Sequence, residues 1–258
     1  MKTALCTIAF QDRKFEDVLT LAVRAGFDGV EPWGKPDHMP GSYNAAENRR
    51  MARAIRERGL DVSQYGSYIN PVSPGFEREM AEGLDTASDL GTDKIRVWAG
   101  SCGSSEATDE DWQKVISGFR RFADCAGDRG VSLVLEMHLG YLCDTVRGSL
   151  RLVEGVDRPN FLLNFQPMYT DSAGRVVEVA RQVASRVATV HAQNYTTPGR
   201  NTRSLISAGY VDYRAVVREL AAAGFDGYLE VEFVKVDDPE AALMADAAFL
   251  RGLCEGTG

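Results

Sequence analysis

The sequence has little of what a disulfide-stabilised, membrane-spanning or nucleic-acid-binding protein needs. Its five cysteines are odd in number, lie far apart and never form a CxxC pair, which argues against a disulfide framework and a structural zinc site. No apolar run is long enough to span a bilayer, and the first residues lack the pattern of a secretory signal. The formal net charge of −8 disfavours nucleic acid and anionic membranes as partners. We therefore expect a cytoplasmic protein.

The overall composition is ordinary for a globular enzyme-sized domain. Of 258 residues, 44% are hydrophobic and 26% are charged, which supplies enough apolar material for a sizeable core. No linker, low-complexity tract or shift in composition divides the chain. We expect one domain over residues 1–258; the sequence is compatible with a homo-oligomer but does not fix the oligomeric state.

Short apolar runs alternate with longer segments of helical period along the whole chain. Glycines end several of the helical segments, as is typical of helix C-termini. The expected strands are residues 3–10, 29–31, 61–65, 94–98, 131–140, 161–165, 187–193 and 228–233. The expected helices are residues 15–25, 45–58, 76–90, 108–129, 145–156, 175–184, 213–223 and 239–253.

Eight strand–helix units of about 32 residues each predict a (β/α)8 TIM barrel, whose usual length is about 250 residues. A doubly wound open sheet is the alternative, but no Gly-x-Gly-x-x-Gly motif follows the first strand. In a TIM barrel the active site lies at the carboxyl ends of the strands. The polar residues expected there are Glu31, Tyr65, Arg96, Glu136, His138, Gln166, His191, Gln193 and Glu232.

Two strands carry pairs of polar residues on one face, since side chains two positions apart point the same way. Glu136 and His138 end an apolar, buried-type strand, where unpaired polar groups would be costly. Glu230 and Glu232 form the second pair, and one of the two is a candidate for a salt-bridged residue of the barrel wall. His191 ends another strand; it is either a site residue or a core histidine bonded to backbone.

These side chains predict a metal site. A cation bound by Glu136, His191, Glu232 and an amide oxygen from Asn164 or Gln166 would have nitrogen and oxygen ligands, which suits Mn²⁺, Mg²⁺, Co²⁺ or Zn²⁺. Such a cation, holding a ketone and a neighbouring hydroxyl, acidifies the C–H between them and stabilises an enediolate. Two carboxylates could then remove and return the proton.

Other residues at the strand ends are candidates for substrate binding. Arg96 could hold a substrate oxygen while Trp98 covers a sugar ring, or Arg96 could instead form an interior ion pair with Glu31 or Glu136. His138 could bond substrate or support a ligand. The remaining candidates are Glu31, Gln193 and Arg203, the last of these in a loop where a solvated charge is the alternative.

Five short motifs occur in an order and at spacings that resemble a known family. They are GFDGVE at 26–31, LEMH at 135–138, PNF at 159–161, VH at 190–191 and GYLEVE at 227–232. This set resembles the xylose isomerase-like barrel superfamily, in the branch of sugar phosphate isomerases and epimerases. The branch includes ketose 3-epimerases, inosose dehydratase, 3-dehydroshikimate dehydratase and endonuclease IV. The resemblance implies Glu136, His191 and Glu232 as metal ligands, with Glu136 and Glu232 as the proton-transfer pair.

The sequence departs from the family pattern at two strands. Alignment on Pro167 places Gln166, or alternatively Asn164, where the family has an Asp ligand. At residues 191–194 the family's His-x-Lys-Asp is replaced by HAQN. Amides in place of charged groups imply a metal that is bound more loosely, retained with altered chemistry, or lost.

The resemblance implies a metal-dependent isomerase or epimerase of a keto sugar or related polyol, acting through an enediolate. The alternative is a lyase or dehydratase that expels a β-substituent from a keto sugar, keto-inositol or oxidised glycoside. A second alternative is a non-catalytic sugar-binding barrel. Endonuclease IV activity is disfavoured, because the chain is acidic and has only three histidines, too few for a trinuclear zinc cluster.

Overall fold

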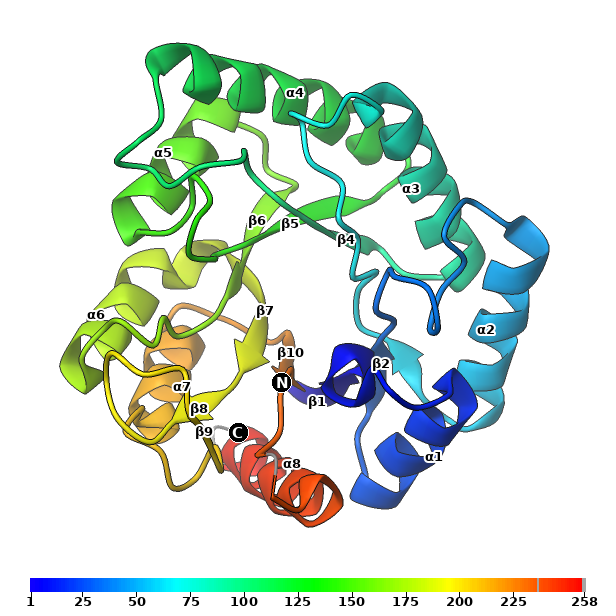
Figure 1. Ribbon diagram of the computed structural model, residues 1–258, viewed down its shortest axis with the longest axis vertical. Helices are drawn as coiled ribbons and strands as arrows, with labels where there is room; N and C mark the ends of the chain where they lie inside the picture. The colour runs from blue at the N-terminus through cyan, green and yellow to red at the C-terminus, as the bar shows by residue number, and fades with distance from the viewer. Residues whose placement is uncertain (236, 257–258) are drawn as a thin grey trace.

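A parallel sheet curls into a barrel in the computed structural model, which describes residues 1–235 and 237–256 (Figure 1). The strand order is β3-β2-β1-β10-β7-β6-β5-β4. The strands are β1 (Lys2–Cys6), β2 (Gly29–Glu31), β3 (Asp61–Val62), β4 (Lys94–Val97), β5 (Ser132–Glu136), β6 (Phe161–Phe165), β7 (Val187–Ala192) and β10 (Tyr228–Val231). Each strand pairs in parallel with its neighbours in this order.

The barrel closes between the segment after β3 and strand β4. Tyr65 forms an isolated parallel bridge with Ile95. The Tyr65 amide donates to the Lys94 carbonyl at 2.9 Å, and the Arg96 amide donates to the Tyr65 carbonyl at 2.9 Å. This closure with sequential strand order is that of a TIM barrel, so the predicted fold is confirmed.

Helices surround the barrel (Figure 1). They are α1 (Phe15–Ala25), α2 (Ala45–Glu57), α3 (Phe76–Leu90), α4 (Asp109–Gly127), α5 (Val146–Val156), α6 (Ala173–Val183), α7 (Tyr213–Ala222) and α8 (Pro239–Glu255), with two short 3-10 turns, η1 (Thr7–Phe10) and η2 (Ala184–Arg186). Apolar residues at helical spacing, such as Phe15, Val18 and Leu19 of α1, are buried against the sheet. A capping box of Thr108 and Asp111 begins α4. Over the described ranges, no helix is long and apolar enough to cross a bilayer.

The first predicted strand is shorter than expected. It was expected over residues 3–10, but β1 ends at Cys6 and the chain turns into η1. The turn has a physical cause, because the Thr7 hydroxyl accepts the Trp33 amide at 2.8 Å and bonds Nδ1 of His38 at 2.9 Å. These contacts draw the segment toward the loop after β2.

Two further differences concern residues near the barrel mouth. The strand expected at 61–65 is regular only over Asp61–Val62. The long loop after β7, which was not expected to hold regular structure, contains an antiparallel hairpin of β8 (Asn194–Tyr195) and β9 (Arg203–Ser204). The hairpin fixes Arg203 opposite Tyr195 and so places a cationic side chain at the carboxyl end of the barrel.

Candidate active site

Six ionisable side chains meet inside the carboxyl end of the barrel. Each is at most 5% exposed, and together they come from five strands: Glu31, Arg96, Glu136, His191, Glu230 and Glu232. Burying so many charged groups is costly unless they are paired or bind a cation. The contacts of each group therefore decide whether it is paired within the protein or available to a cation.

Arg96 is the cationic partner of two carboxylates. Its Nη1 atom lies 3.1 Å from Oε1 of Glu31 and 3.1 Å from Oε2 of Glu136. Its Nη2 donates to the Gly66 carbonyl at 3.3 Å. A side chain at position 66 would bring a Cβ within 2.6 Å of Oε1 of Glu31, so glycine is required there for close approach. Of the two roles considered for Arg96, the structure has the interior ion pair.

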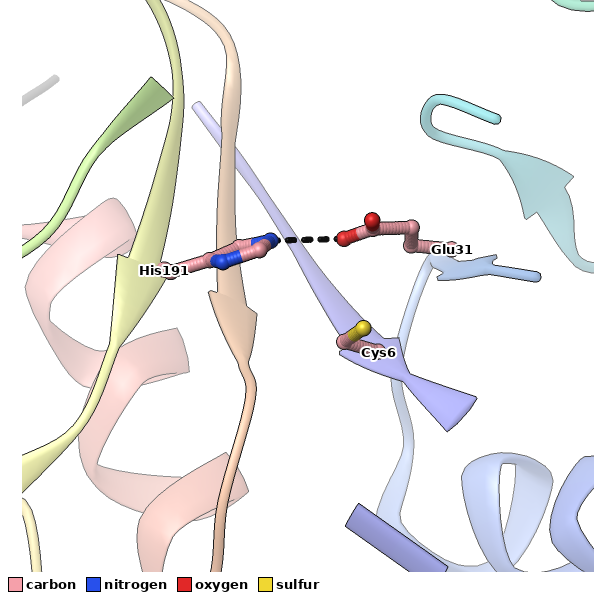
Figure 2. A group of neighbouring side chains, drawn as sticks. All are labelled: Cys6, Glu31 and His191. Carbon is pink, nitrogen blue, oxygen red and sulfur yellow. Dashed lines mark hydrogen bonds and ion pairs between the residues drawn. The ribbon is translucent and has the colours of Figure 1, made fainter. Parts of the chain in front are cut away.

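His191 is held between carboxylates on both sides of its ring. Nε2 lies 2.7 Å from Oε2 of Glu31, across the barrel from β7 to β2 (Figure 2). Nδ1 lies 3.4 Å from Oε1 of Glu232 and 3.9 Å from Oε1 of Glu136. Burial alone would lower the pKa of His191, but the charges of Glu232 and Glu31 raise it well above its ordinary value.

The carboxyl groups differ in how readily they ionise. Burial raises the pKa of Glu230 well above its ordinary value, and the adjacent Glu31 adds to this. Burial opposes ionisation of Glu31 and Glu232 too, but Arg96 and His191 lower the pKa of Glu31, and His191 lowers the pKa of Glu232. Burial raises the pKa of Glu136. The environments thus push the pKa values of the carboxyl groups in opposite directions, as in proton-transfer sites.

Gln64 joins the cluster and was missed by sequence reasoning. Its Nε2 donates to Oε2 of Glu31 at 3.1 Å and to Oε2 of Glu230 at 3.2 Å. Thr189 donates to its Oε1 at 3.2 Å. The available signal was its place at the end of the expected strand 61–65, where Tyr65 was chosen instead. Of Glu230 and Glu232, Glu230 is therefore the one that is held within the barrel wall, by Gln64.

One triplet of side chains fits a divalent cation. Glu136, His191 and Glu232 each offer a ligand atom, and these atoms lie within 4.8 Å of one another. Within residues 1–235 and 237–256, neither Nδ1 of His191 nor Oε2 of Glu232 has a hydrogen-bond partner, although both are buried. A ring nitrogen and a carboxylate oxygen that are buried without hydrogen-bond partners are free to bind a cation at this position. The donor set of carboxylate and imidazole suits Mn²⁺, Co²⁺ or Zn²⁺.

A second triplet, Cys6, Glu31 and His191, satisfies the same distance (Figure 2). It is the poorer site for two reasons. Nε2 of His191 and Oε2 of Glu31 already bond each other. Burial and the nearby Glu31 raise the pKa of the Cys6 thiol well above its ordinary value, whereas metal binding requires the thiolate.

Gln166 does not present the amide oxygen expected of a metal ligand. Its Nε2 donates to the Met137 carbonyl at 2.6 Å and to Oε1 of Glu136 at 3.1 Å. Its Oε1 accepts from Nε2 of Gln193 at 2.5 Å. The alternative, Asn164, uses its Oδ1 to accept the His191 amide at 3.1 Å. An amide nitrogen cannot ligate a cation, so as oriented here Gln166 presents no ligand atom to a cation beside Glu136, and the Asn164 oxygen is engaged by the His191 amide.

Asn194, where the family has Asp, has a structural role. Its Nδ2 donates to the carbonyls of Ile206 and Val211 at 2.8 and 3.0 Å. A carboxylate could not make these bonds, because it only accepts. A Cβ at Gly209 would lie 2.1 Å from the Asn194 amide carbon, so this loop closes tightly on the Asn194 side chain.

A pocket of about 240 Å³ opens beside the cluster. Among its lining residues are His138, Gln166, Gln193, Arg203, Glu232 and Phe233. Trp98 is not part of this lining; it stacks on Tyr68 with ring centres 5.3 Å apart and lies 5.0 Å from the ring of His138. Of the predicted substrate-binding residues, His138, Gln193 and Arg203 line this pocket, and Trp98 contacts it through the ring of His138.

Known proteins resemble this chain in sequence over most of its length. A family model described as "Xylose isomerase-like TIM barrel" matches residues 19–253. A 3-dehydroshikimate dehydratase of Bacillus anthracis is 25% identical over 243 residues, covering 85% of this chain and 87% of the relative. An inosose dehydratase of Geobacillus thermodenitrificans is 27% identical over 260 residues, covering 84% and 81%.

Solved structures share the fold. A crystal structure of the IOLI protein with a bound zinc atom superimposes with a TM-score of 0.81 at 17% identity, covering 100% of this chain and 99% of that one. At this level of identity the likeness concerns the fold alone. The resemblance drawn from the five sequence motifs is confirmed by the family match.

Proposed function

Because this chain belongs to the xylose isomerase-like TIM barrel family, we propose that it is a metal-dependent dehydratase acting on a cyclic or sugar-derived ketone that carries a β-hydroxyl group. The sequence motifs put isomerisation first and elimination second. The names of the two sequence relatives, both dehydratases, support the reverse order. Both reactions begin with removal of a proton from the carbon next to the ketone.

The observation that carries the proposal is the placement of Glu136 and Glu232 around His191. All three ligand atoms lie within 4.8 Å of one another, at the mouth of the barrel where substrates bind. A divalent cation held by these residues would polarise the substrate ketone as a Lewis acid. Metal binding is favoured over loss of the metal, because the unpartnered atoms of His191 and Glu232 remain buried.

The two carboxylates are suited to the proton transfers of an elimination. One of them takes the proton from the carbon next to the ketone, and the electrons of that C–H bond form a carbon–carbon double bond. The β-hydroxyl group leaves with a proton from the second carboxyl, so that water is released. Each transfer needs a carboxyl within hydrogen-bond reach of the substrate.

Several neighbouring side chains hold these groups in place. Arg96 fixes one oxygen of Glu136, and Glu31 bonds Nε2 of His191, which leaves Nδ1 for the cation. In the pocket, His138, Gln193 and Arg203 are proposed to contact the substrate. Arg203 supplies a cation for a substrate carboxylate or hydroxyl.

The test is to incubate the purified protein with Mn²⁺ and either 3-dehydroshikimate or inosose in deuterated water. A dehydratase produces a conjugated product, seen as new ultraviolet absorbance together with loss of one water from the substrate mass. Deuterium incorporation without loss of water would support the epimerase hypothesis instead. Binding of either ketone without turnover or exchange would support a non-catalytic barrel.

A further inference from the structure

We propose that Arg203, Gln193 and Gln166 form a one-directional hydrogen-bond relay that positions Glu136. Nη1 of Arg203 donates to Oε1 of Gln193. Nε2 of Gln193 donates to Oε1 of Gln166 at 2.5 Å, and Nε2 of Gln166 donates to Oε1 of Glu136 at 3.1 Å. The relay runs from the hairpin at the pocket mouth to a carboxylate of the proposed active site. Only its effect on turnover rests on the proposed function.

The direction of the relay is fixed by its two ends. A guanidinium group has only donors, so Gln193 must turn its oxygen toward Arg203. At the other end the Met137 carbonyl only accepts, and it lies 2.6 Å from Nε2 of Gln166. Reversing either amide would place two acceptors, or two donors, against each other. Both glutamines are at most 4% exposed, so a lost bond leaves a buried polar group without its partner, which is costly.

The residues of the relay are themselves anchored. The backbone of Gln193 is held by the Tyr213 hydroxyl, which accepts from the Gln193 backbone N–H at 2.8 Å and donates to the Gln193 backbone carbonyl at 2.9 Å. Arg203 is held by pairing with Tyr195 in the hairpin, and its guanidinium lies over the rings of Tyr195 and Phe233 at 4.9 and 4.4 Å. Such stacking restricts the guanidinium to one plane.

Glu136 is contacted at both of its oxygens, by an ion pair at Oε2 and by a hydrogen bond at Oε1. Arg96 holds Oε2 and Gln166 holds Oε1, so the carboxylate plane is set from two sides. Arg203 has no carboxylate within ion-pair distance among the residues that the structure describes, and it lines the pocket. A change at Arg203 is expected to reach Glu136 through two neutral amides, whereas its charge acts directly on Glu232, whose pKa it lowers.

The first test needs no substrate or metal. In ¹⁵N-labelled protein, the side-chain amide signals of Gln166 and Gln193 are assigned by their loss in Gln166→Met and Gln193→Met. Arg203→Met is expected to shift the Gln166 signal, although Arg203 does not touch Gln166. Arg200→Met, an exposed change on the same loop, is expected to leave that signal in place. An unmoved Gln166 signal in a folded Arg203→Met protein would overturn the relay.

The second test asks whether the effects of replacing Arg203 and Gln166 on kcat depend on each other. We expect Gln166→Met to lower kcat about tenfold, with KM changed by less than about twofold, because Gln166 acts on Glu136 rather than on the substrate. Arg203→Met should lower kcat by a larger factor in the wild-type background than once Gln166 is replaced, since only the part of its effect that passes through Gln166 is then lost. Effects on kcat that multiply in the double variant would contradict the relay. If the protein turns over neither ketone, the proposed function is wrong. The Gln166 side-chain amide signal still tests the relay in that case.

Discussion

Nε2 of His191 lies 2.7 Å from Oε2 of Glu31, and this contact turns the other ring nitrogen toward Glu136 and Glu232. A histidine that donates one ring N–H to a carboxylate is fixed in one tautomer, and its second nitrogen becomes the better metal ligand. Glu31 thus determines which ring nitrogen of His191 is available to a cation, without being a ligand itself.

Glu31→Gln tests this arrangement. We expect the dissociation constant for Mn²⁺ or Zn²⁺ to rise about 10-fold to 100-fold, because the imidazole loses its anionic partner. Glu230→Gln is the matched control. Its carboxyl is equally buried, but burial and Glu31 raise its pKa well above the ordinary value, so a neutral amide there is expected to change the charge of the cluster less than Glu31→Gln does. Titration calorimetry with the metal alone measures both. Equal losses of affinity in the two variants would contradict the role of Glu31.

Gln166→Glu tests whether the missing anionic ligand can be restored. The change keeps the shape of the side chain but sets a carboxylate 3.1 Å from Oε1 of Glu136. We expect the metal-free protein to lose stability through like-charge repulsion, and the affinity for Mn²⁺ to rise at least about tenfold. Thermal unfolding with Mn²⁺ and with a chelator measures both effects.

Gln182→Glu is the control for this substitution. Gln182 also donates to a glutamate, Glu178, at 2.8 Å, but on the exposed surface of α6. There the same change is expected to shift the melting temperature by only a small amount, and equally with and without metal. If Gln166→Glu also shifts the melting temperature only slightly, and equally with and without Mn²⁺, residue 166 does not face a cation.

Replacing the proton-transfer carboxylates tests the chemistry. Glu136→Gln and Glu232→Gln should each lower kcat on the ketone substrate about 10²-fold to 10⁴-fold, since neither amide can accept the substrate proton. The measurement is the rate of product absorbance at saturating substrate and metal, with deuterium exchange into the remaining ketone followed in parallel. Retention of exchange in both variants would place the base elsewhere.

Much of this site could be predicted because the position of a residue along a strand fixes where it lies in a TIM barrel. Glu31, Glu136 and Glu232 end strands, and strand ends in a closed barrel meet at one mouth whatever their distance along the chain. The period of two also placed Glu230 and Glu232 on one face. These inferences need only the strand pattern, which short apolar runs mark well.

The direction of a side-chain amide could not be predicted in this way. Gln166 turns its nitrogen to Glu136 because the Met137 carbonyl and Gln193 surround it, and those partners directly follow β5 and β7. The hairpin of β8 and β9 was missed for a related reason. Two-residue strands show no periodicity, and this pairing depends on Asn194 bonding carbonyls of the later loop.

Asp246 of α8 provides a test of stability away from the site. It is fully buried, and its Oδ1 accepts the Ile206 amide at 2.7 Å. In the described part of the chain, Oδ2 has no hydrogen-bond partner. Burial raises the pKa of Asp246 to about 7, whereas the unfolded chain has the ordinary value of about 3.9.

Since the folded protein binds this proton more tightly than the unfolded chain, the contribution of Asp246 to stability should be greatest at low pH. It should fall as the pH rises from about 4 through 7. Asp246→Asn keeps the acceptor for Ile206 and removes the buried charge. We therefore expect the variant to be more stable by about 2 to 4 kcal/mol at pH 8 and nearly unchanged at pH 4. Urea unfolding at the two pH values measures this, with the exposed Asp226→Asn as the control. A loss of stability at pH 8 would show that the ionised carboxylate has a partner that asparagine cannot replace.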